Sequence, residues 1–490
     1  MKKLSEIKEK SFDFLLTIFF LVILFILKAP YFNLPFWWDE GNHLDGAVKI
    51  IENNFNPFIE WWSYHPPLVY ELVAFTYQLI GKWSMAARLI ILFFSLLTLI
   101  FTYLLGKKLY NRQIGFLAAV FLLFCPIFFA QSGLFQLAVP LAAMTTMTLY
   151  AYFDYVQDHR SMRFYLIAGS LLVLVKELAV LVILVVVIFN LVTNLKNFSK
   201  KETMVKNCLL MLPLLIFGIW LIGNKVVFGW FLWPHNVNYF TLKSSGETAG
   251  LDFILASFFF HDYRFLISTL IFMAGFLSLF IKRVKTSIFR KELFSFFALT
   301  LVAIIFFWWG PFLPRYLLFI YPLFFIVGAA SLTALIRNKL LVLIISLLII
   351  SLFISHWVTN QLIWGGETRL DYIRAIEVHQ QMAEYIESRW LDYKIITVWP
   401  MSSELQFPPL GYVSKPLDVF LLEDGGKKIK EKGEALLLTN EIFHGNEFGK
   451  KLRLLSETQD LELIKQFTVK GEELLLYFTK NVEEIMLYLQ

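Results

Sequence analysis

Predominantly apolar runs of about 20 residues, the length that an α-helix needs to cross the hydrocarbon core of a bilayer, recur along this chain and begin with residues 12–29. Hydrophobic residues make up 58% of the 490 residues and charged residues 17%, against roughly 45–50% and about 25% in soluble domains. A soluble fold cannot bury this much apolar surface. The sequence therefore predicts an α-helical, polytopic membrane protein.

The positively charged residues report orientation, because the cytoplasmic loops of membrane proteins are enriched in Lys and Arg. They cluster in short loops here, so the net charge of +6 does not indicate nucleic-acid binding. Four lysines within the first ten residues predict a cytoplasmic N-terminus. Residues 12–29 then lead out of the cytoplasm, and the first outer loop is predicted to span residues 31–83.

One apolar stretch of this loop, residues 66–81, is short and includes Glu71 and Gln78. If it crossed the membrane, the basic stretch at 106–112 would lie outside, against the positive-inside rule. We therefore expect residues 66–81 to form a helix that lies on or dips into the outer interface.

The apolar run 164–195 has basic residues at both ends, so it must cross the membrane an even number of times. Its roughly 32 residues cannot supply two full spans of about 20 residues each. We expect a pair of short helices whose turn lies near Lys176 and Glu177, the only charged pair in the run. A charged side chain inside a membrane segment is costly and marks a candidate functional site.

The same rule gives about eleven crossings and puts the C-terminus outside. The predicted spans are 12–29, 84–105, 113–131, 134–153, two short helices in 164–195, 208–228, 264–281, 290–310, 316–336 and 340–357. Residues 1–357 then form a membrane domain and residues 358–490 an extracytoplasmic domain. An amphipathic helix at 369–390 and the strand-like runs KIITVW, ALLLT, LELIKQF and ELLLYF predict a small α/β fold for the outer domain. The compact, bacterial-style chain favours the plasma membrane over the endoplasmic reticulum.

Polar residues gather on the predicted outer side. Asp39 and Glu40 open an amphipathic helix, and because adjacent residues diverge by about 100° on a helix, they cannot both face one small site. Either Asp39 caps the helix and Glu40 favours its positive end, or one of them is a catalytic carboxylate. His65 follows Trp61 and Trp62, a pair that is typical of an interfacial anchor.

Three cations lie near the outer ends of predicted spans: Lys176, Arg264 in HDYR and Arg315 in PFLPRY. Each has a simpler explanation, since Lys176 could snorkel and either arginine could meet lipid phosphates. Together they would surround one site that suits an anionic group. The sequence contains no HExxH, GxSxG or Walker motif, which favours an enzyme acting on a lipid phosphate.

In order along residues 12–340, these features resemble the polyprenyl-phosphate-sugar-dependent glycosyltransferases of the GT-C superfamily, near the protein O-mannosyltransferases and lipid A aminoarabinose transferases. The shared landmarks are Asp39-Glu40, the stretch from His65 to Leu68 with Gly81 at its end, Arg88-Leu89, the lone Lys176 between short helices, and Arg315-Tyr316. One landmark is absent. Relatives often carry an acid two residues before the Pro of the fourth span, whereas Ala138 precedes Pro140 here and Gln136 is the nearest polar residue.

The resemblance implies a GT-C fold and transfer of a sugar from a polyprenyl-phosphate donor to a hydroxyl group on a glycan, lipid or protein. It implies Asp39 as general base, with Glu40 as the second candidate. The implied ligands of the donor phosphate are Lys176, Arg315, Arg264 and Arg88. The implied substrate ligands are His65, His43, His261 and Tyr316.

Two alternatives stay open. Some relatives use a divalent metal ion and others do not, and the acids and histidines named above leave a metal site open here. A transporter or lipid flippase with an outer partner-binding domain is the competing function. Such proteins commonly show repeated halves, and this chain has no evident repeat. A non-catalytic receptor would leave the first-loop acids and the lysine at membrane depth unexplained.

Overall fold

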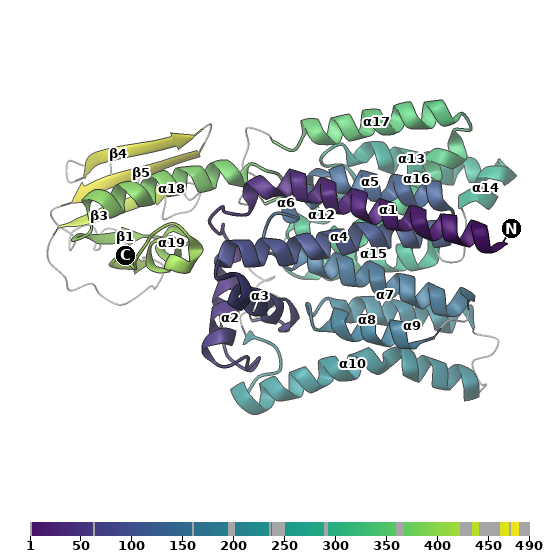
Figure 1. The fold of residues 1–490 in the computed structure, drawn as a ribbon, viewed down its shortest axis with the longest axis horizontal. Coiled ribbons are helices and arrows are strands. Elements are labelled where there is room, and N and C mark those ends of the chain that lie inside the picture. Colours follow the sequence, from purple (N-terminus) through teal and green to yellow (C-terminus); the bar gives the residue numbers. More distant parts are fainter. Residues whose placement is uncertain are drawn as a thin grey trace. The chain divides into compact units, whose positions relative to one another are not determined.

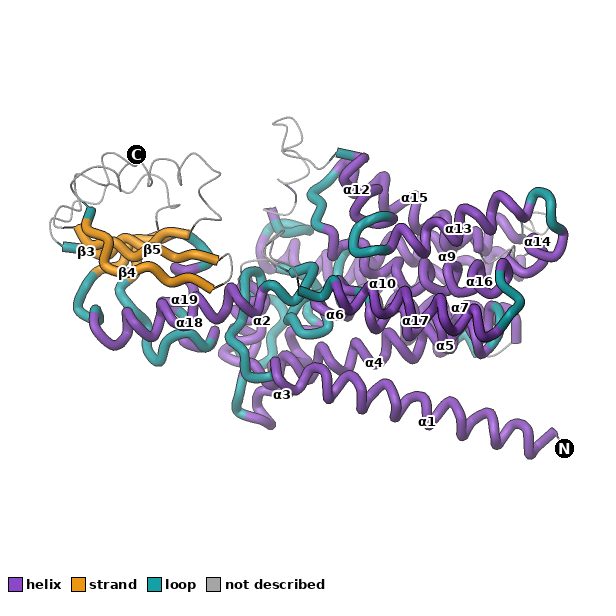
Figure 2. The backbone as a smooth tube through the Cα atoms, turned by 90° about the horizontal axis from the view of Figure 1, so that it is seen from above, coloured by secondary structure: helices purple, strands orange, loops and turns teal. Residues whose placement is uncertain are grey.

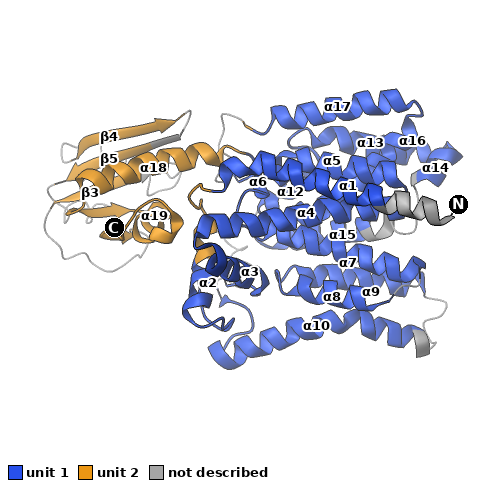
Figure 3. Ribbon diagram, in the orientation of Figure 1, with its two compact units in different colours: residues 1–32, 45–357, 367–369 blue, residues 33–44, 358–366, 370–490 orange. Residues whose placement is uncertain are grey.

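The computed structural model of the chain divides into two compact units, shown in separate colours in Figure 3. The first unit contains residues 1–32, 45–357 and 367–369, and the second contains residues 33–44, 358–366 and 370–490. A piece of the first outer loop thus belongs with the C-terminal residues. The structure describes residues 2–61, 64–158, 161–194, 201–234, 237, 250–288, 293–358, 367–421, 434–440, 461–469 and 472–479.

The first unit is a bundle of helices, many of which run alongside one another in both views (Figures 1 and 2). Its first half contains α1 (Lys2–Lys28), η1 (Ala29–Tyr31), most of α2 (Glu40–Glu52), α3 (Leu68–Ile80), α4 (Trp83–Leu109), α5 (Arg112–Phe124), α6 (Pro126–Gln131), α7 (Ala138–Asp158), α8 (Arg163–Val173) and α9 (Ala179–Thr193). Its second half contains α10 (Lys201–Phe228), α12 (Leu251–Phe259), α13 (Arg264–Ser278), α14 (Lys282–Ile288), α15 (Leu293–Trp309), η4 (Pro314–Ile320), α16 (Tyr321–Leu335) and α17 (Lys339–Ser355).

Within the described residues, four helical segments are long and apolar enough to cross a membrane. They are Ser11–Tyr31, Trp83–Leu109, Thr203–Phe228 and Pro314–Leu335. A fifth span results if α12 and α13, which are bent by 91° at their break, count as one. Six more apolar helices have 10–17 residues. The prediction of a polytopic helical membrane protein is therefore confirmed, while the count of eleven crossings stays a prediction.

Two local predictions of secondary structure are confirmed, while the outer position of both stretches stays a prediction. Helix α8 ends at Val173 and α9 begins at Ala179, so Lys176 lies in the turn between two short helices. Helix α3 occupies the stretch expected at the interface and ends at Gly81. With φ at +74°, Gly81 adopts the left-handed C-cap that glycine allows without a Cβ clash.

The basic stretch 106–112 was predicted as a loop, but most of it is helical. Helix α4 continues to Leu109 with two lysines in its last turn, and α5 starts at Arg112. Basic side chains there face the negative end of the helix dipole. A Cβ on Gly106 would lie 2.7 Å from the Cα of Gly115. The two helices therefore pack backbone to backbone, as small residues permit in membrane bundles.

The second unit contains α18 (Tyr372–Arg389), α19 (Met401–Gln406), η6 (Pro408–Leu410) and one five-stranded sheet. The strands are β1 (Lys394–Thr397), β2 (Val419–Leu421), β3 (Ala435–Asn440), β4 (Glu462–Val469) and β5 (Glu472–Thr479), in the order β2-β1-β3-β5-β4. Strand β1 is parallel to β2 and β3, and β5 is antiparallel to β3 and β4. The predicted small C-terminal sheet is confirmed. Strand β2 was not predicted because its three residues are too few for an alternating pattern.

Candidate active site

A histidine that precedes α3 meets a glutamate in the turn between α8 and α9. His65 Nδ1 lies 2.9 Å from Glu177 Oε2. Next to this pair, the backbone N–H of Leu68 donates a hydrogen bond of 3.1 Å to the carbonyl oxygen of Leu174. These contacts join the start of α3 to the turn, so the stretch from His65 to Leu68 and the turn that carries Lys176 lie side by side.

The carboxyl group of Glu177 is paired with the imidazole of His65 and directly follows Lys176 in the turn. The lysine therefore has an acidic neighbour in the turn. The sequence had marked Lys176 and Glu177 as a charged pair and assigned a role to the lysine only.

Two cations meet at one aromatic ring. Lys176 Nζ lies 4.5 Å from the centroid of the Tyr316 ring, and the guanidinium carbon of Arg315 lies 5.5 Å from it. Both distances are within the range of cation–π attraction. Arg315 is 5% exposed and opens η4, whose first residue, Pro314, has a fixed φ that suits a helix start. Lys176 and Arg315 thus lie beside the same ring, and their role as ligands of the donor phosphate stays a prediction.

A carboxylate that the sequence did not indicate completes this cluster. Glu367, 2% exposed, forms an ion pair with Arg315. Its Oε1 accepts a hydrogen bond of 2.9 Å from Gln136 Nε2, and its backbone oxygen accepts one of 2.8 Å from Gln131 Nε2. Gln136 is the polar residue nearest to the position where relatives often carry an acid. A buried carboxylate thus reaches that neighbourhood from the segment after α17.

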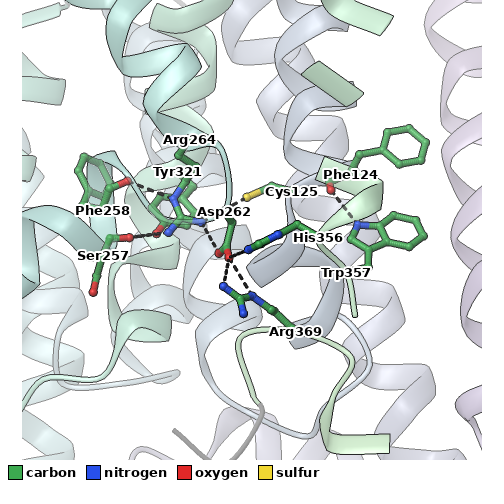
Figure 4. Close-up of polar contacts among 10 residues, drawn as sticks. All are labelled: Phe124, Cys125, Ser257, Phe258, Asp262, Arg264, Tyr321, His356, Trp357 and Arg369. Carbon is green, nitrogen blue, oxygen red and sulfur yellow. Dashed lines mark hydrogen bonds and ion pairs between the residues drawn. The ribbon is translucent and has the colours of Figure 1, made fainter. Parts of the chain in front are cut away.

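Arg264 lies in a second cluster at the break between α12 and α13, drawn in Figure 4. Its Nη1 lies 2.9 Å from Asp262 Oδ2, and its Nε and Nη2 donate hydrogen bonds of 3.1 and 2.5 Å to the carbonyl oxygens of Phe258 and Ser257. These carbonyls end α12 and would otherwise lack helical partners. The contacts favour a structural role for Arg264, and its assignment to the donor phosphate stays a prediction.

Asp262 also contacts two basic residues near the C-terminal end of the first unit. Arg369 Nη2 lies 2.9 Å and His356 Nε2 lies 3.5 Å from Asp262 Oδ1, as Figure 4 shows. Arg369 is only two residues beyond Glu367. The short segment 367–369 therefore contacts both clusters, with Glu367 in the Lys176–Arg315 cluster and Arg369 in the Asp262 cluster.

The first-loop acids and His43 belong to the second unit. Glu40 is fully buried, and its Oε2 accepts a hydrogen bond of 2.7 Å from the backbone N–H of Trp37. Asp39 is half-buried, and its carbonyl oxygen accepts from the N–H of His43. The two carboxylates thus differ in surroundings, as their divergence on a helix predicted. The catalytic assignment of Asp39 and Glu40 stays a prediction.

The remaining predicted residues lie on α4 and at the break between α12 and α13. Arg88 is 2% exposed in α4, where its charge interacts with that of Lys28 at the end of α1. His261 is exposed at the break between α12 and α13, with its ring 6.1 Å from that of Phe253. Trp62 lies outside the described residues. The roles predicted for Arg88, His43 and His261 stay predictions.

No ready ligand set for a divalent metal ion exists among the residues that the structure describes. Groups of three or more His, Cys, Asp or Glu side chains close enough to hold an ion do not occur in that part of the chain. The use of a divalent metal ion therefore stays a prediction.

Residues 64–222 match the sequence profile of the dolichyl-phosphate-mannose-protein mannosyltransferase family. This stretch includes His65, Arg88 and Lys176. No curated protein is similar enough in sequence to count as a match.

Among solved structures, the chain is similar to ArnT from Cupriavidus metallidurans bound to undecaprenyl phosphate, at 14% identity and a TM-score of 0.58, covering 94% of this chain and 97% of that one. It is also similar to the archaeal oligosaccharyltransferase AglB from Archaeoglobus fulgidus in complex with an inhibitory peptide and a dolichol-phosphate. That match has 12% identity and a TM-score of 0.54, and covers 95% of this chain and 74% of that one. The predicted resemblance to the GT-C glycosyltransferases is confirmed, and the fold is shared over nearly the whole chain.

Proposed function

We propose that this protein is a membrane glycosyltransferase that moves a sugar from a polyprenyl-phosphate donor to a hydroxyl group. The observation that carries the proposal is the meeting of Lys176 and Arg315 at the ring of Tyr316. It occurs in a fold shared with ArnT bound to undecaprenyl phosphate. Two neighbouring cations of this kind suit the negative charge of one lipid-linked phosphate.

The carboxylate of Glu367 supports this assignment, because it already forms an ion pair with Arg315. A guanidinium that faces a carboxylate has its N–H groups oriented for an anion, and the same fork of donors can bind two oxygens of a phosphate. His65 and Glu177 fix the turn that carries Lys176. The donor phosphate would share or replace these carboxylate contacts.

In the reaction, Asp39 removes the proton from the acceptor hydroxyl, and the acceptor oxygen bonds to the anomeric carbon of the sugar. The bond between that carbon and the donor phosphate oxygen breaks, and its electron pair leaves with polyprenyl phosphate. Lys176 and Arg315 stabilise the charge that develops on this phosphate, a form of electrostatic catalysis. The positioned base contributes about 10² to 10⁴ in rate.

We also propose an orientation of the chain in the membrane. The N-terminus lies in the cytoplasm, the chain crosses the plasma membrane eleven times, and residues 358–490 lie outside. The acceptor, a glycan, lipid or protein, would be used on the non-cytoplasmic face, and the sugar would be a hexose or a pentose.

Binding of undecaprenyl phosphate tests the phosphate site. We expect Lys176→Met, which keeps the apolar stem, to weaken binding by about tenfold or more, since a charge-assisted contact is lost. Arg315→Gln combined with Glu367→Gln should weaken it similarly without leaving a buried carboxylate unpaired. Native mass spectrometry of the full-length protein in detergent measures the bound fraction.

Undecaprenol, which lacks the phosphate, serves as the matched lipid, and Lys225→Met, a change of an exposed lysine in α10, serves as the matched variant. Undecaprenol binding should not respond to the two site variants. Equal binding of undecaprenyl phosphate by the wild type and both site variants would contradict the assignment.

A further inference from the structure

The backbone just before Asp39 is fastened to the C-terminal part of the second unit. The N–H of Phe36 donates a hydrogen bond of 2.9 Å to the carbonyl oxygen of Leu410, the last residue of η6. The following Gly411 has φ at +94°, and a Cβ there would lie 3.5 Å from the Cα of Pro35. Glycine suits this close approach of two backbones.

The next two residues are held by their indole rings. The Trp37 ring is fully buried and meets the His379 ring edge to face, with centroids 4.9 Å apart. The Trp38 ring meets that of Trp399 at 4.7 Å. Trp38 has φ at +54°, a left-handed conformation that costs a bulky residue about 1–3 kcal/mol and persists only where the surroundings impose it. The strained residue directly precedes Asp39.

A hydrogen bond closes the loop on the other side of Asp39. The buried carboxylate of Glu40 accepts from the backbone N–H of Trp37, and the N–H of Glu40 donates to the carbonyl oxygen of Trp37 at 3.0 Å. Asp39 therefore projects from a short loop whose two ends, Trp37 and Glu40, are tied to each other. The contact of the Trp37 ring with His379 therefore helps to hold the loop in place.

His379 on α18 is itself oriented by a buried carboxylate. His379 Nδ1 lies 2.6 Å from Glu404 Oε2 on α19, and the two side chains are 0% and 2% exposed. Within the described part of the chain, His379 Nε2 and Glu404 Oε1 have no hydrogen-bond partner. An apolar pair of similar volume is often as stable as a buried polar pair, so the ring of His379 can be tested apart from its polar partner.

We propose that the C-terminal domain positions the first-loop carboxylate, with His379 as the positioning residue, whose ring acts on Asp39 through the ring of Trp37. The inference rests on the proposed function in one respect, namely that Asp39 is the base. The contacts that hold the Asp39 loop do not depend on the role of Asp39, and hydrogen–deuterium exchange measures them separately. A base that shifts by about 1 Å loses up to ~100-fold in rate.

Two variants separate the ring contact from the polar pair. His379→Asn puts an amide near the place of Nδ1 and keeps a donor for Glu404, but removes the ring that Trp37 contacts. His379→Phe combined with Glu404→Leu keeps an aromatic ring beside Trp37 and removes both polar groups. Phe467→Leu is the matched control, because it removes a buried ring from β4 that packs on Tyr385 of the same α18 helix.

Hydrogen–deuterium exchange of the peptide covering residues 33–44 is measured in full-length protein. We expect exchange in His379→Asn to rise by about tenfold, in line with a lost aromatic contact, with wild-type rates in the double variant and in the control. Sugar transfer in His379→Asn should show a lower kcat, by about 10- to 100-fold, with unchanged affinity for undecaprenyl phosphate. The double variant should recover most of kcat.

If His379→Asn fails to fold, the double variant decides, because the inference requires wild-type exchange of residues 33–44 in it. Unchanged exchange in a folded His379→Asn variant, or unchanged kcat despite faster exchange, would overturn the inference. If the wild type transfers no sugar from any donor, the proposed function fails, and the exchange rates still decide whether the C-terminal domain holds the Asp39 loop.

Discussion

The cations of the candidate site each lie beside a carboxylate. Glu177 follows Lys176 in the turn and meets His65, and Glu367 meets Arg315. Such balance lowers the cost of holding charge at membrane depth. A phosphate that binds here would therefore replace carboxylates as the partner of these cations. It would not enter a cluster of uncompensated positive charge.

Replacing Glu177 by Gln should destabilise the turn that carries Lys176. We expect Glu177→Gln to cost about 1 kcal/mol at pH 7, because the contact with His65 loses its carboxylate. Thermal unfolding of the detergent-solubilised protein measures the difference. Glu60→Gln, a change of an exposed carboxylate in the loop before α3, is the control, and equal unfolding midpoints for Glu177→Gln and Glu60→Gln would contradict the account.

The sequence singled out Lys176, Arg315 and His65 one by one, from local pattern and resemblance, but could not pair them with their carboxylates. His65 and Glu177 are 112 residues apart, and Gln136 and Glu367 are 231 apart. Periodicity is read in windows of about 11–18 residues, so such lateral contacts leave no local signal.

At the scale of elements, the break between α12 and α13 is the clearest departure from a regular span. The two helices bend by 91°, and Asp262 and Tyr263 between them have φ at +53° and +60°. Asp tolerates this left-handed region better than most residues. The sequence predicted the span from residue 264 onward, but not helix α12 before it. Asp262 binds Arg264, the first residue of α13, and Arg369, so the break is tied to the segment 367–369.

Asp262→Asn keeps the size of this side chain and removes its charge. We expect a loss of about 3–5 kcal/mol, because the buried Arg264 would lose its compensating charge. The matched control is Asp252→Asn, a change of an exposed acid in the first turn of α12. Denaturation midpoints of the detergent-solubilised variants measure the effect. A midpoint for Asp262→Asn equal to that of Asp252→Asn would show that the cluster does not hold the break.

For the molecule as a whole, hydropathy and the positive-inside rule predicted most of the long helices of the first unit, and strand-like runs predicted the small sheet of the second. Apolar length is a strong local signal. Membership of the Asp39 segment in the second unit was not predictable, since it depends on contacts of Phe36 and Trp37 with residues near the other end of the chain. Eleven crossings also remain a prediction, because several helices are shorter than a full span.

The central claim is that Asp39 activates the acceptor while Lys176 and Arg315 hold the donor phosphate. The direct measurement is release of undecaprenyl phosphate, together with sugar transfer, from undecaprenyl-phosphate-linked hexoses and pentoses by the full-length protein. We predict turnover of at least one donor by the wild type. Asp39→Asn should fold and bind undecaprenyl phosphate like the wild type, yet lose about 10² to 10⁴ in rate, while Lys176→Met should lose donor affinity. Full activity of Asp39→Asn, or no release from any donor by the wild type, would contradict the account.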